Sequence, residues 1–222
     1  MTKILFLGKS DNEHCDKAAA IVRKRFADPL IRCSKRGDEM PSDAANWRGD
    51  YIISFLSPFV LPQEMLDRAT KAAINFHPGP PEYPGIGCTN FAIYDEVSEF
   101  GITCHHMARA VDTGPVIDVR RFPVTMNDSV LDLTLRCYDH ILECFEDIIE
   151  VISEGRDLPV SDEHWTRRAY TRRELNELCR IESEMSEREI KRRIRATVFP
   201  NAPGPFIELY GARFEYRAPS DN

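Results

Sequence analysis

Short apolar runs alternate with amphipathic stretches in the first third of the chain. Lys3–Gly8, Tyr51–Leu56 and Ala72–His77 are rich in strand-forming residues and are each too short for a helix. A helical pattern of apolar positions covers Cys15–Phe26, and a short helix is expected over Glu64–Lys71. Strand, helix, strand, helix, strand is typical of a parallel sheet in an α/β fold. The pattern therefore predicts an α/β class with a mainly parallel, twisted sheet.

The middle of the chain begins with a loop and continues with more regular elements. Pro78–Gly87 holds four prolines and three glycines in ten residues, which is typical of a loop. After it we expect a short helix over Phe91–Val97, capped by Thr89 or Asn90. Further along, the pattern predicts strands Phe100–Met107 and Val116–Val124, and then a long helix Asp128–Ser153 with an apolar stripe over Leu131, Leu135, Tyr138, Leu142, Phe145, Ile149 and Ile152.

The last quarter of the chain carries signals of smaller elements. Thr171-x-x-Glu174 and Ser186-x-x-Glu189 are capping boxes, which indicate two helix starts. Two short strands, Phe206–Tyr210 and Arg213–Tyr216, are expected around Gly211. We therefore divide the chain into a core domain, residues 1–165, and a small α+β C-terminal extension, residues 166–222.

Charge and hydropathy limit the partners of the protein. The 222 residues carry a net charge of −7, which disfavours a nucleic-acid partner because phosphate backbones require a basic surface. No apolar run reaches the roughly 18 residues of a membrane span, and the apolar part of the N-terminus is too short for a signal peptide. Residues 166–195 are locally basic, with ten Lys or Arg against six Asp or Glu. This segment is either a solvated helical face or a contact for a phosphate-bearing ligand.

Seven cysteines stand at positions 15, 33, 88, 104, 137, 144 and 179. Their number is odd and no Cys-x-x-Cys pair occurs, so neither a zinc ribbon nor a thioredoxin-type motif is supported. The pattern is that of reduced thiols, and we expect a cytoplasmic protein.

Candidate chemistry gathers at one edge of the predicted sheet. Asn75 and His77 end the third strand on the same face, and Asp112 lies in a turn between two later strands. An amide, an imidazole and a carboxylate can perform acyl transfer, because the amide donates to an oxyanion and the imidazole moves protons. Each residue alone is equally compatible with a structural role. No metal is expected, since the adjacent His105 and His106 point to opposite faces of a strand. The first turn lacks Gly-x-Gly-x-x-Gly, so a nicotinamide cofactor is unsupported.

Three segments together resemble the folate-dependent formyltransferase family. They are Ile74–Gly87, which contains Asn-Phe-His-Pro-Gly-Pro, Phe100–Met107, and Val111–Ile117, which contains Val-Asp-Thr-Gly-Pro. The resemblance covers roughly residues 1–155 and implies a Rossmann-like domain with N10-formyltetrahydrofolate as co-substrate. It also implies that Asn75, His77 and Asp112 are the catalytic set. The segment Ser57–Pro62 resembles the folate-pocket loop, so the residues expected to bind the folate are Phe59, Val60, Leu61, Ala110 and Asp112.

Within this family the Pro-Gly-rich loop and the tail, Tyr170–Glu174 and Ile194–Phe206, are similar to those of sugar N-formyltransferases, which act on nucleotide-linked amino sugars. This similarity implies a role in cell-surface polysaccharide (O-antigen) synthesis. The residues expected to contact the acceptor are Lys9, Tyr83, Gly85, Gly87, Asn90 and His105. A surface lysine, a turn tyrosine and a helix cap are alternative readings of Lys9, Tyr83 and Asn90.

Other acceptors stay open at this point. His105 lies seven residues before Asp112, as in glycinamide ribonucleotide formyltransferases, but the glycine-rich phosphate loop of that branch is missing. Only 57 residues follow position 165, fewer than the second domain of methionyl-tRNA formyltransferases requires. A formyltetrahydrofolate hydrolase, a transferase for another amine and a non-catalytic folate- or nucleotide-binding module are further alternatives. The C-terminal hairpin and basic helices offer a surface for a homodimer.

Overall fold

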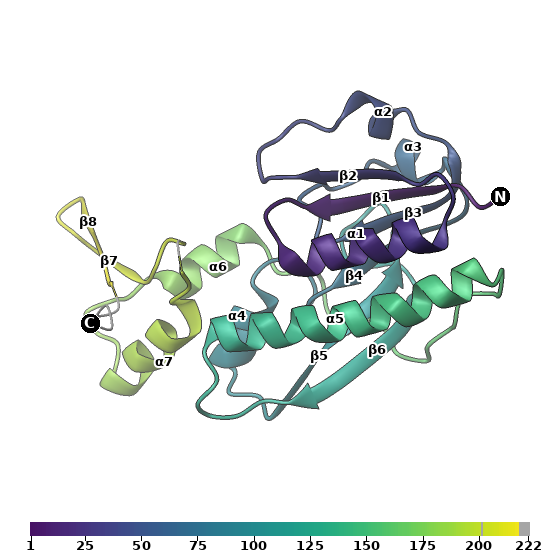
Figure 1. Cartoon of the computed structure of the whole chain (residues 1–222). Helices are drawn as coiled ribbons and strands as arrows, with labels where there is room; N and C mark the ends of the chain where they lie inside the picture. The colour runs from purple at the N-terminus through teal and green to yellow at the C-terminus, as the bar shows by residue number, and fades with distance from the viewer. Residues whose placement is uncertain (201, 218–222) are drawn as a thin grey trace.

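A six-stranded sheet forms the centre of the protein in a computed structural model, which describes residues 1–200 and 202–217 (Figure 1). Asn201 and residues 218–222 of the predicted extension lie outside the described residues. The strand order is β2-β1-β3-β4-β5-β6. Strands β2, β1, β3 and β4 are parallel, whereas β5 is antiparallel to both β4 and β6. Their bounds are β1 Ile4–Lys9, β2 Leu30–Ser34, β3 Gly49–Phe55, β4 Ala69–His77, β5 Glu99–His106 and β6 Val116–Pro123.

Two long helices, α1 (Glu13–Arg25) and α5 (Val130–Ser153), cover one face of the sheet. Phe6, Phe55 and Phe76 from three neighbouring strands point to this face, and their rings surround that of Phe145 from α5 at centroid distances of 5.1–5.9 Å. Alternate residues of each strand share a face, so the intervening residues must point to the other side. This aromatic cluster is the centre of the larger hydrophobic core.

The opposite face of the sheet is covered by short elements only. Leu5, Leu7 and Ile52 pack there against helices α2 (Ser42–Ala45) and α3 (Gln63–Leu66) and the segment that precedes α3. Because these elements cover only part of the face, its edge at the carboxyl ends of the strands stays accessible to a ligand.

Several local details differ from the sequence predictions. Strand β2 and helix α2 were not predicted, because the edge strand β2 is only partly buried and lacks the apolar run of the central strands. The short helix ends at Leu66 and not at Lys71, since β4 already begins at Ala69. On α5, Leu135 of the predicted apolar stripe is exposed, whereas Leu133 and Cys137, two positions before and after it, face the core.

Helix α4 (Cys88–Tyr94) starts earlier than predicted. Its N-cap is Gly87, at a positive φ of 75° and without a side-chain capping bond. Thr89 therefore lies inside the helix, where its hydroxyl pairs with that of Thr134 on α5. Asn90 also lies inside and donates from Nδ2 to the carbonyl oxygen of Ala196. Neither residue is the cap, because the loop enters the helix with a left-handed residue that favours glycine.

The C-terminal extension consists of α6 (Arg172–Cys179), α7 (Glu187–Thr197) and a hairpin of β7 (Phe206–Leu209) and β8 (Ala212–Glu215). Both predicted helix starts are confirmed, since the side chains of Thr171 and Ser186 accept from backbone N–H groups three residues later. Figure 1 shows the extension beside α4, with the hairpin at the end of the molecule opposite the N-terminus. Among the described residues, no helix is both long and apolar enough to cross a membrane.

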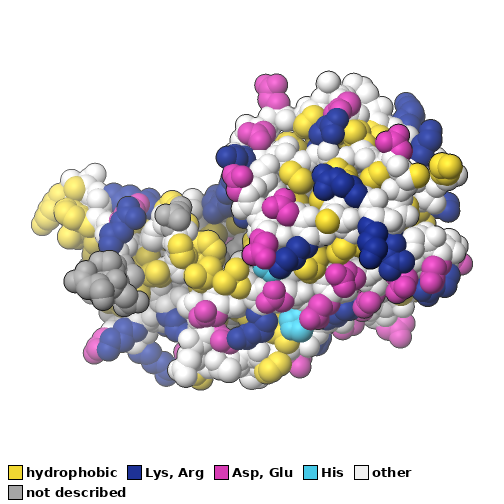
Figure 2. Space-filling view, in the orientation of Figure 1, with side chains coloured by type: hydrophobic (Ala, Val, Ile, Leu, Met, Phe, Trp, Pro, Cys, Tyr) yellow, Lys and Arg dark blue, Asp and Glu magenta, His cyan; other side chains and the backbone are white. Residues whose placement is uncertain are grey.

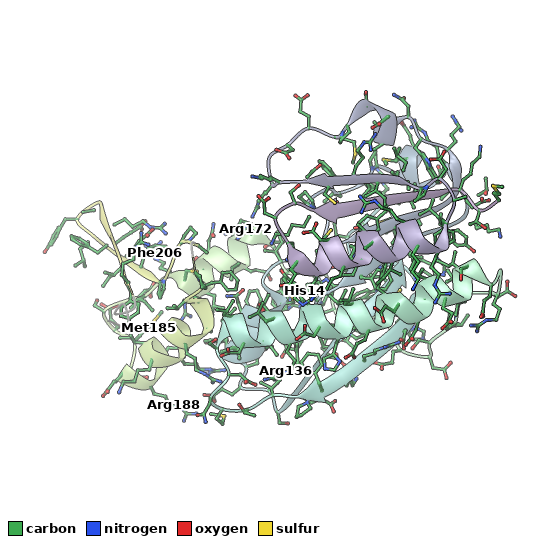
Figure 3. All side chains as sticks on the ribbon, in the orientation of Figure 1. His14, Arg136, Arg172, Met185, Arg188 and Phe206 are labelled. Atoms are coloured by element: carbon green, nitrogen blue, oxygen red, sulfur yellow. The ribbon has the colours of Figure 1, made fainter. Side chains whose placement is uncertain are left out.

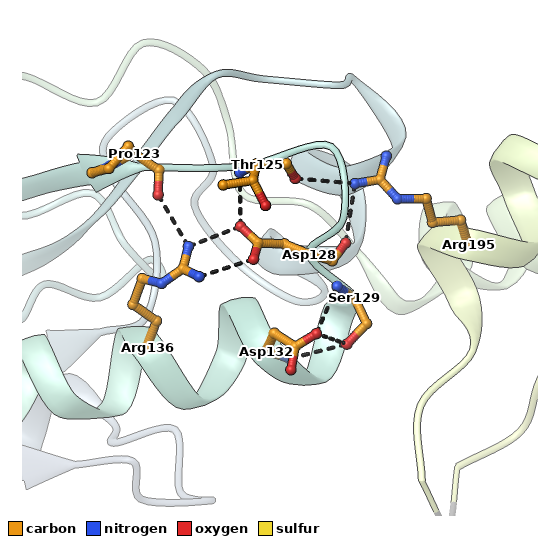
Figure 4. A network of polar contacts seen from close by, with 7 residues as sticks. All are labelled: Pro123, Thr125, Asp128, Ser129, Asp132, Arg136 and Arg195. Carbon is orange, nitrogen blue, oxygen red and sulfur yellow. Dashed lines mark hydrogen bonds and ion pairs between the residues drawn. The ribbon is translucent and has the colours of Figure 1, made fainter. Parts of the chain in front are cut away.

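A polar network joins the extension to the loop before α5 (Figure 4). Arg195 of α7 donates from Nη2 to the backbone carbonyl oxygen of Asp128, at 3.0 Å. The Asp128 carboxylate accepts two hydrogen bonds of 2.9 Å from Arg136 and one of 2.8 Å from the backbone N–H of Thr125. Bidentate Arg–carboxylate pairs are among the stronger polar contacts in proteins. The loop is thus held in a shape that presents the carbonyl oxygens of Thr125 and Asp128 to Arg195 of α7.

This network makes a prediction about stability against pH. The hydrogen bonds from Arg136 and then the backbone of Thr125 outweigh burial and lower the pKa of Asp128 to about 2. A carboxylate with a lowered pKa stabilises the folded state above roughly pH 4, and this contribution is lost as the pH falls towards 2. Asp128→Asn should therefore lower the free energy of unfolding by about 2 kcal/mol at pH 7, and the deficit should shrink below pH 4.

Urea unfolding of both proteins at pH 7, 5, 4 and 3 measures this difference. Asp162→Asn, at an exposed carboxylate, is the matched control and should unfold like the parent at each pH. A deficit that stays constant over this range would show that the Asp128 carboxylate does not stabilise the fold through its charge.

Candidate active site

Two neighbouring strands bring three polar side chains to one edge of the sheet. Asn75 and His77 end β4 on the face that carries the short helices. In the antiparallel pair of β4 and β5, His105 lies directly opposite Asn75. The Nδ2 atom of Asn75 is 3.1 Å from Nε2 of His105, so strand register alone sets this contact. His77 and His105 are both almost completely buried.

A tight loop between β5 and β6 places Asp112 beside these histidines. Asp112 has a positive φ of 50°, a left-handed conformation that aspartate tolerates better than most residues. Gly114 follows two residues later, and a Cβ there would lie 1.9 Å from the carbonyl oxygen of His106. Only glycine allows this close approach of loop to strand. The carbonyl oxygen of Gly114 accepts a 2.8 Å hydrogen bond from the indole Nε1 of Trp165, which fixes the loop from the other side.

The Asp112 carboxylate contacts both histidines of the cluster and the Pro-Gly-rich loop. Its Oδ2 accepts a 2.7 Å hydrogen bond from the backbone N–H of Gly85 and lies 3.3 Å from Nδ1 of His77. Its Oδ1 lies 3.2 Å from Nε2 of His105. Burial raises the pKa of a carboxyl, but the two histidines and the Gly85 N–H outweigh burial, and the pKa of Asp112 lies well below its ordinary value. Asp112 is therefore a buried carboxylate at neutral pH.

The contacts of His77 restrict what its ring can do. Nδ1 faces the Asp112 carboxylate, and Nε2 lies 2.8 Å from the carbonyl oxygen of Tyr83. Only the protonated ring donates to both oxygens at once, because a neutral imidazole has one N–H. His105 differs, since its Nδ1 lies 2.8 Å from the carbonyl oxygen of His106 and its Nε2 faces Asn75 and Asp112. Both ring nitrogens of His77 therefore face oxygen acceptors, one of them on a buried anion.

A cavity of about 930 Å³ opens next to this cluster. Its volume is near the upper end of the range for small-molecule sites. One wall is apolar and includes Phe59, Val60 and Leu61. Val60 is 71% exposed, so its side chain is accessible to a molecule in the cavity. The other wall carries backbone and polar groups of the Pro-Gly-rich loop and of the start of the extension.

The residues singled out in the sequence divide between the cavity and the protein interior. Those that line the cavity are Asn75, His77, Asp112, Phe59, Val60, Leu61, Ala110, Lys9, Gly85 and His105. Three expected acceptor contacts, Tyr83, Gly87 and Asn90, do not line it. The Tyr83 hydroxyl donates to Asp95, Gly87 caps α4, and Asn90 bonds to α7. Their contact with an acceptor stays a prediction.

The extension contributes to the site more than its sequence suggested. Gly85 pairs with Tyr170 as an isolated β-bridge, and its positive φ of 88° and a Cβ distance of 2.4 Å to the Tyr170 carbonyl oxygen exclude larger residues. The Trp165 ring stands edge-on to His77 and His105, at centroid distances of 5.8 and 5.0 Å. Trp165 therefore supports both imidazoles, although the predicted domain boundary falls directly after it.

Four other residues that line the cavity were not predicted from the sequence. Ser54 of β3 lies beside Asn75 on the neighbouring strand, and Tyr138 of α5 also lines the cavity. Arg36 and Arg172 line the cavity from the loop after β2 and from the start of α6. The local basic charge was the one sequence signal for Arg172, whereas Arg36 carried none. Within residues 1–200 and 202–217, no group of three or more His, Cys, Asp or Glu is arranged to hold a metal ion.

Comparison with known proteins places this geometry in a family. The model of the formyl transferase family matches residues 9–148, more than half of the chain. GDP-perosamine N-formyltransferase of Brucella melitensis is 26% identical over 204 residues, which cover 91% of this chain and 77% of that protein. Methionyl-tRNA formyltransferase of Lysinibacillus sphaericus is 29% identical over 154 residues, which cover 66% of this chain and 47% of that protein.

Solved structures share the fold over almost the whole chain. A 4-N formyltransferase from Francisella tularensis is 16% identical with a TM-score of 0.78, and the match covers 98% of this chain and 97% of that one. The N-formyltransferase from Helicobacter canadensis, in complex with folinic acid and dTDP-3-aminofucose, is 18% identical with a TM-score of 0.72, and the match covers 95% and 85%. The mixed α/β architecture with its mainly parallel sheet is thus that of the formyltransferases. Together with the match to its sequence model, this shows that the chain belongs to the formyl transferase family.

Proposed function

We propose that the protein transfers the formyl group of N10-formyltetrahydrofolate to the amine of a nucleotide-linked amino sugar. The observation that carries the proposal is the buried Asn75, His77 and Asp112 cluster between an apolar and a polar cavity wall. Such a site suits a flat apolar donor on one side and a polar acceptor on the other. The relatives named for sugar N-formyl transfer, at 26% identity over most of both chains, favour this acceptor.

The proposed reaction proceeds through a tetrahedral intermediate. The amine nitrogen attacks the formyl carbon, and the carbonyl electron pair moves to oxygen. Asn75 and a protonated His77 stabilise this oxyanion by donation and by charge. As the bond from carbon to N10 breaks, N10 takes a proton, and the amine loses one. The protonated His77 gives its proton to N10, and the neutral ring then takes the proton that the amine loses. Asp112 compensates the charge of His77 while the ring is protonated.

The first prediction concerns His77. His77→Ala and His77→Gln should each lower kcat by about 10²–10⁴-fold with little change in KM, because the ring acts mainly on the transition state. His164→Ala, at an exposed histidine that does not line the cavity, should behave like the parent. The assay uses N10-formyltetrahydrofolate with a panel of nucleotide-linked amino sugars and detects the formyl mass on the product.

The same assay separates the remaining acceptors. Formate release that needs no amine would indicate a hydrolase, and a formyl gain on glycinamide ribonucleotide or another amine would replace the sugar. Binding of ligands without any turnover would identify a binding module. Full kcat in His77→Gln would refute the catalytic role of His77.

The second prediction concerns the apolar wall. Val60→Asp places a charge where the folate ring system is expected, so KM for N10-formyltetrahydrofolate should rise about tenfold, or roughly 1.4 kcal/mol. The fold should not suffer, since Val60 is already exposed. Val160→Asp is a matched control at an exposed valine that does not line the cavity. Equal KM values for Val60→Asp and Val160→Asp would place the donor elsewhere.

We also propose that the protein is a homodimer that associates through its C-terminal hairpin. Figure 2 shows hydrophobic side chains gathered over the hairpin, where Leu209, Tyr210, Phe214 and Tyr216 are all exposed. Monomeric proteins rarely expose so many neighbouring large apolar residues. The predicted cytoplasmic location rests on the cysteine pattern, and the predicted role in polysaccharide synthesis rests on the resemblance to sugar N-formyltransferases.

Light scattering after gel filtration tests the homodimer. The parent should have about twice the mass of the 25.5 kDa chain, and Phe214→Lys should shift it towards the monomer. Met126→Lys, at an exposed apolar residue away from the hairpin, should leave the mass unchanged. A monomeric parent would refute the homodimer, and a dimeric Phe214→Lys would refute the hairpin as its interface.

A further inference from the structure

Three cationic side chains line the cavity in addition to the catalytic cluster. Lys9 ends β1, Arg36 lies in the turn after β2, and Arg172 is the first residue of α6. They come from parts of the sequence that are far apart, and folding brings them to one cavity. Figure 3 shows Arg172 at the end of α6 that faces the central sheet. The catalytic chemistry proposed above uses none of them.

These cations have no carboxylate partner among the described residues, because the nearby acids are engaged elsewhere. Asp11 pairs with Lys35 at 2.8 Å, and Asp38 accepts from the backbone N–H of Lys35. Glu174 pairs with Arg168 at 3.0 Å and accepts from the backbone N–H of Thr171. The cavity therefore carries positive charge that no carboxylate of the described chain neutralises.

Two of the cations are close enough to influence each other. Partial burial, and then the charge of Arg36, lower the pKa of Arg172. Two like charges held near one another repel, and an anion between them removes the repulsion. The backbone amides at the start of α6 are less suited to this task, since the side chain of Thr171 already accepts from the N–H of Glu174. Side chains would therefore hold the anion.

We infer that Lys9, Arg36 and Arg172 bind the diphosphate of the acceptor. The inference rests on the proposed function and extends it, because it assigns the phosphate-binding residues of the acceptor site. Guanidinium groups suit phosphate oxygens, which they bind in pairs, and a lysine adds a compact point charge. The charge of three cations matches the charge of a diphosphate better than that of a single phosphate.

The inference also resolves the two readings of the basic segment 166–195. Of its ten Lys and Arg residues, Arg172 alone lines the cavity within the described chain. Arg193 pairs with Glu189, and Lys191 pairs with Glu187, as solvated helix faces commonly do. The segment is thus a solvated face in most of its length and supplies one residue to the anion site.

Isothermal titration calorimetry of the full chain with UDP, GDP and dTDP tests the inference without any folate present. The best of these nucleoside diphosphates should bind, and Arg36→Gln and Arg172→Gln should each weaken its binding about tenfold or more. Arg173→Gln is the matched control, because Arg173 neighbours Arg172 but does not line the cavity. The corresponding monophosphate should bind more weakly to the parent, and its affinity should fall by a smaller factor in each variant.

The outcomes separate this inference from the proposed function. Failure of the parent to bind any of the three diphosphates, or binding unaffected by both variants, would overturn the anion site. Equal binding of the mono- and diphosphate would overturn the diphosphate assignment. If diphosphate binding depends on both arginines but no amino sugar is formylated, the anion site stands and the proposed reaction is wrong. If formyl transfer occurs with unchanged KM in both variants, the reaction stands and the anion site is wrong.

Discussion

A buried carboxylate is the constraint on which the rest of the site depends. Asp112 is almost fully removed from water, and a charge in that position destabilises a protein unless it is paired and hydrogen-bonded. Two imidazoles and the backbone N–H of Gly85 provide these partners. Each partner belongs to a different segment, β4, β5 and the Pro-Gly-rich loop. The carboxylate therefore holds three parts of the chain in one arrangement, and the same arrangement places an imidazole beside a buried anion where an oxyanion is proposed to form.

The supporting contacts around this cluster come from Trp165, the last residue of the predicted core domain, and from Tyr170 at the start of the extension. Trp165 holds the Asp112 loop through its indole N–H and packs on both histidines, while Tyr170 pairs with Gly85 on the opposite side. The extension thus takes part in the site and does not merely follow the core domain. It also places Arg172 at the cavity, which joins the proposed acceptor site to the position of α6. Rigid neighbours of this kind maintain the alignment that transition-state stabilisation requires.

The two walls of the cavity explain why one site suits two dissimilar molecules. An apolar wall with an exposed valine suits an aromatic donor, whereas cations without a carboxylate partner in the described part of the chain suit a phosphorylated acceptor. The cluster of Asn75, His77 and Asp112 lies along the same cavity, so both molecules would meet at the groups that move protons. This division is consistent with the fold, since ligands of open α/β sheets bind beyond the carboxyl ends of the strands.

The sequence by itself determined the class of the fold and pointed to three residues that the structure brings to one cavity. Strongly buried strands such as β3 and β4 appear in the sequence as apolar runs. Asn75, His77 and Asp112 stand in short motifs that can be read directly from neighbouring residues. Only the tertiary structure decided the edge strand β2, the helix cap at Gly87 and the roles of Trp165, Arg36 and Arg172. A partly exposed strand leaves a weak periodic signal, and a contact between residues far apart in the chain leaves none. Asn90 illustrates this limit, because its partner is the Ala196 carbonyl, and only packing of α7 against α4 brings the two together.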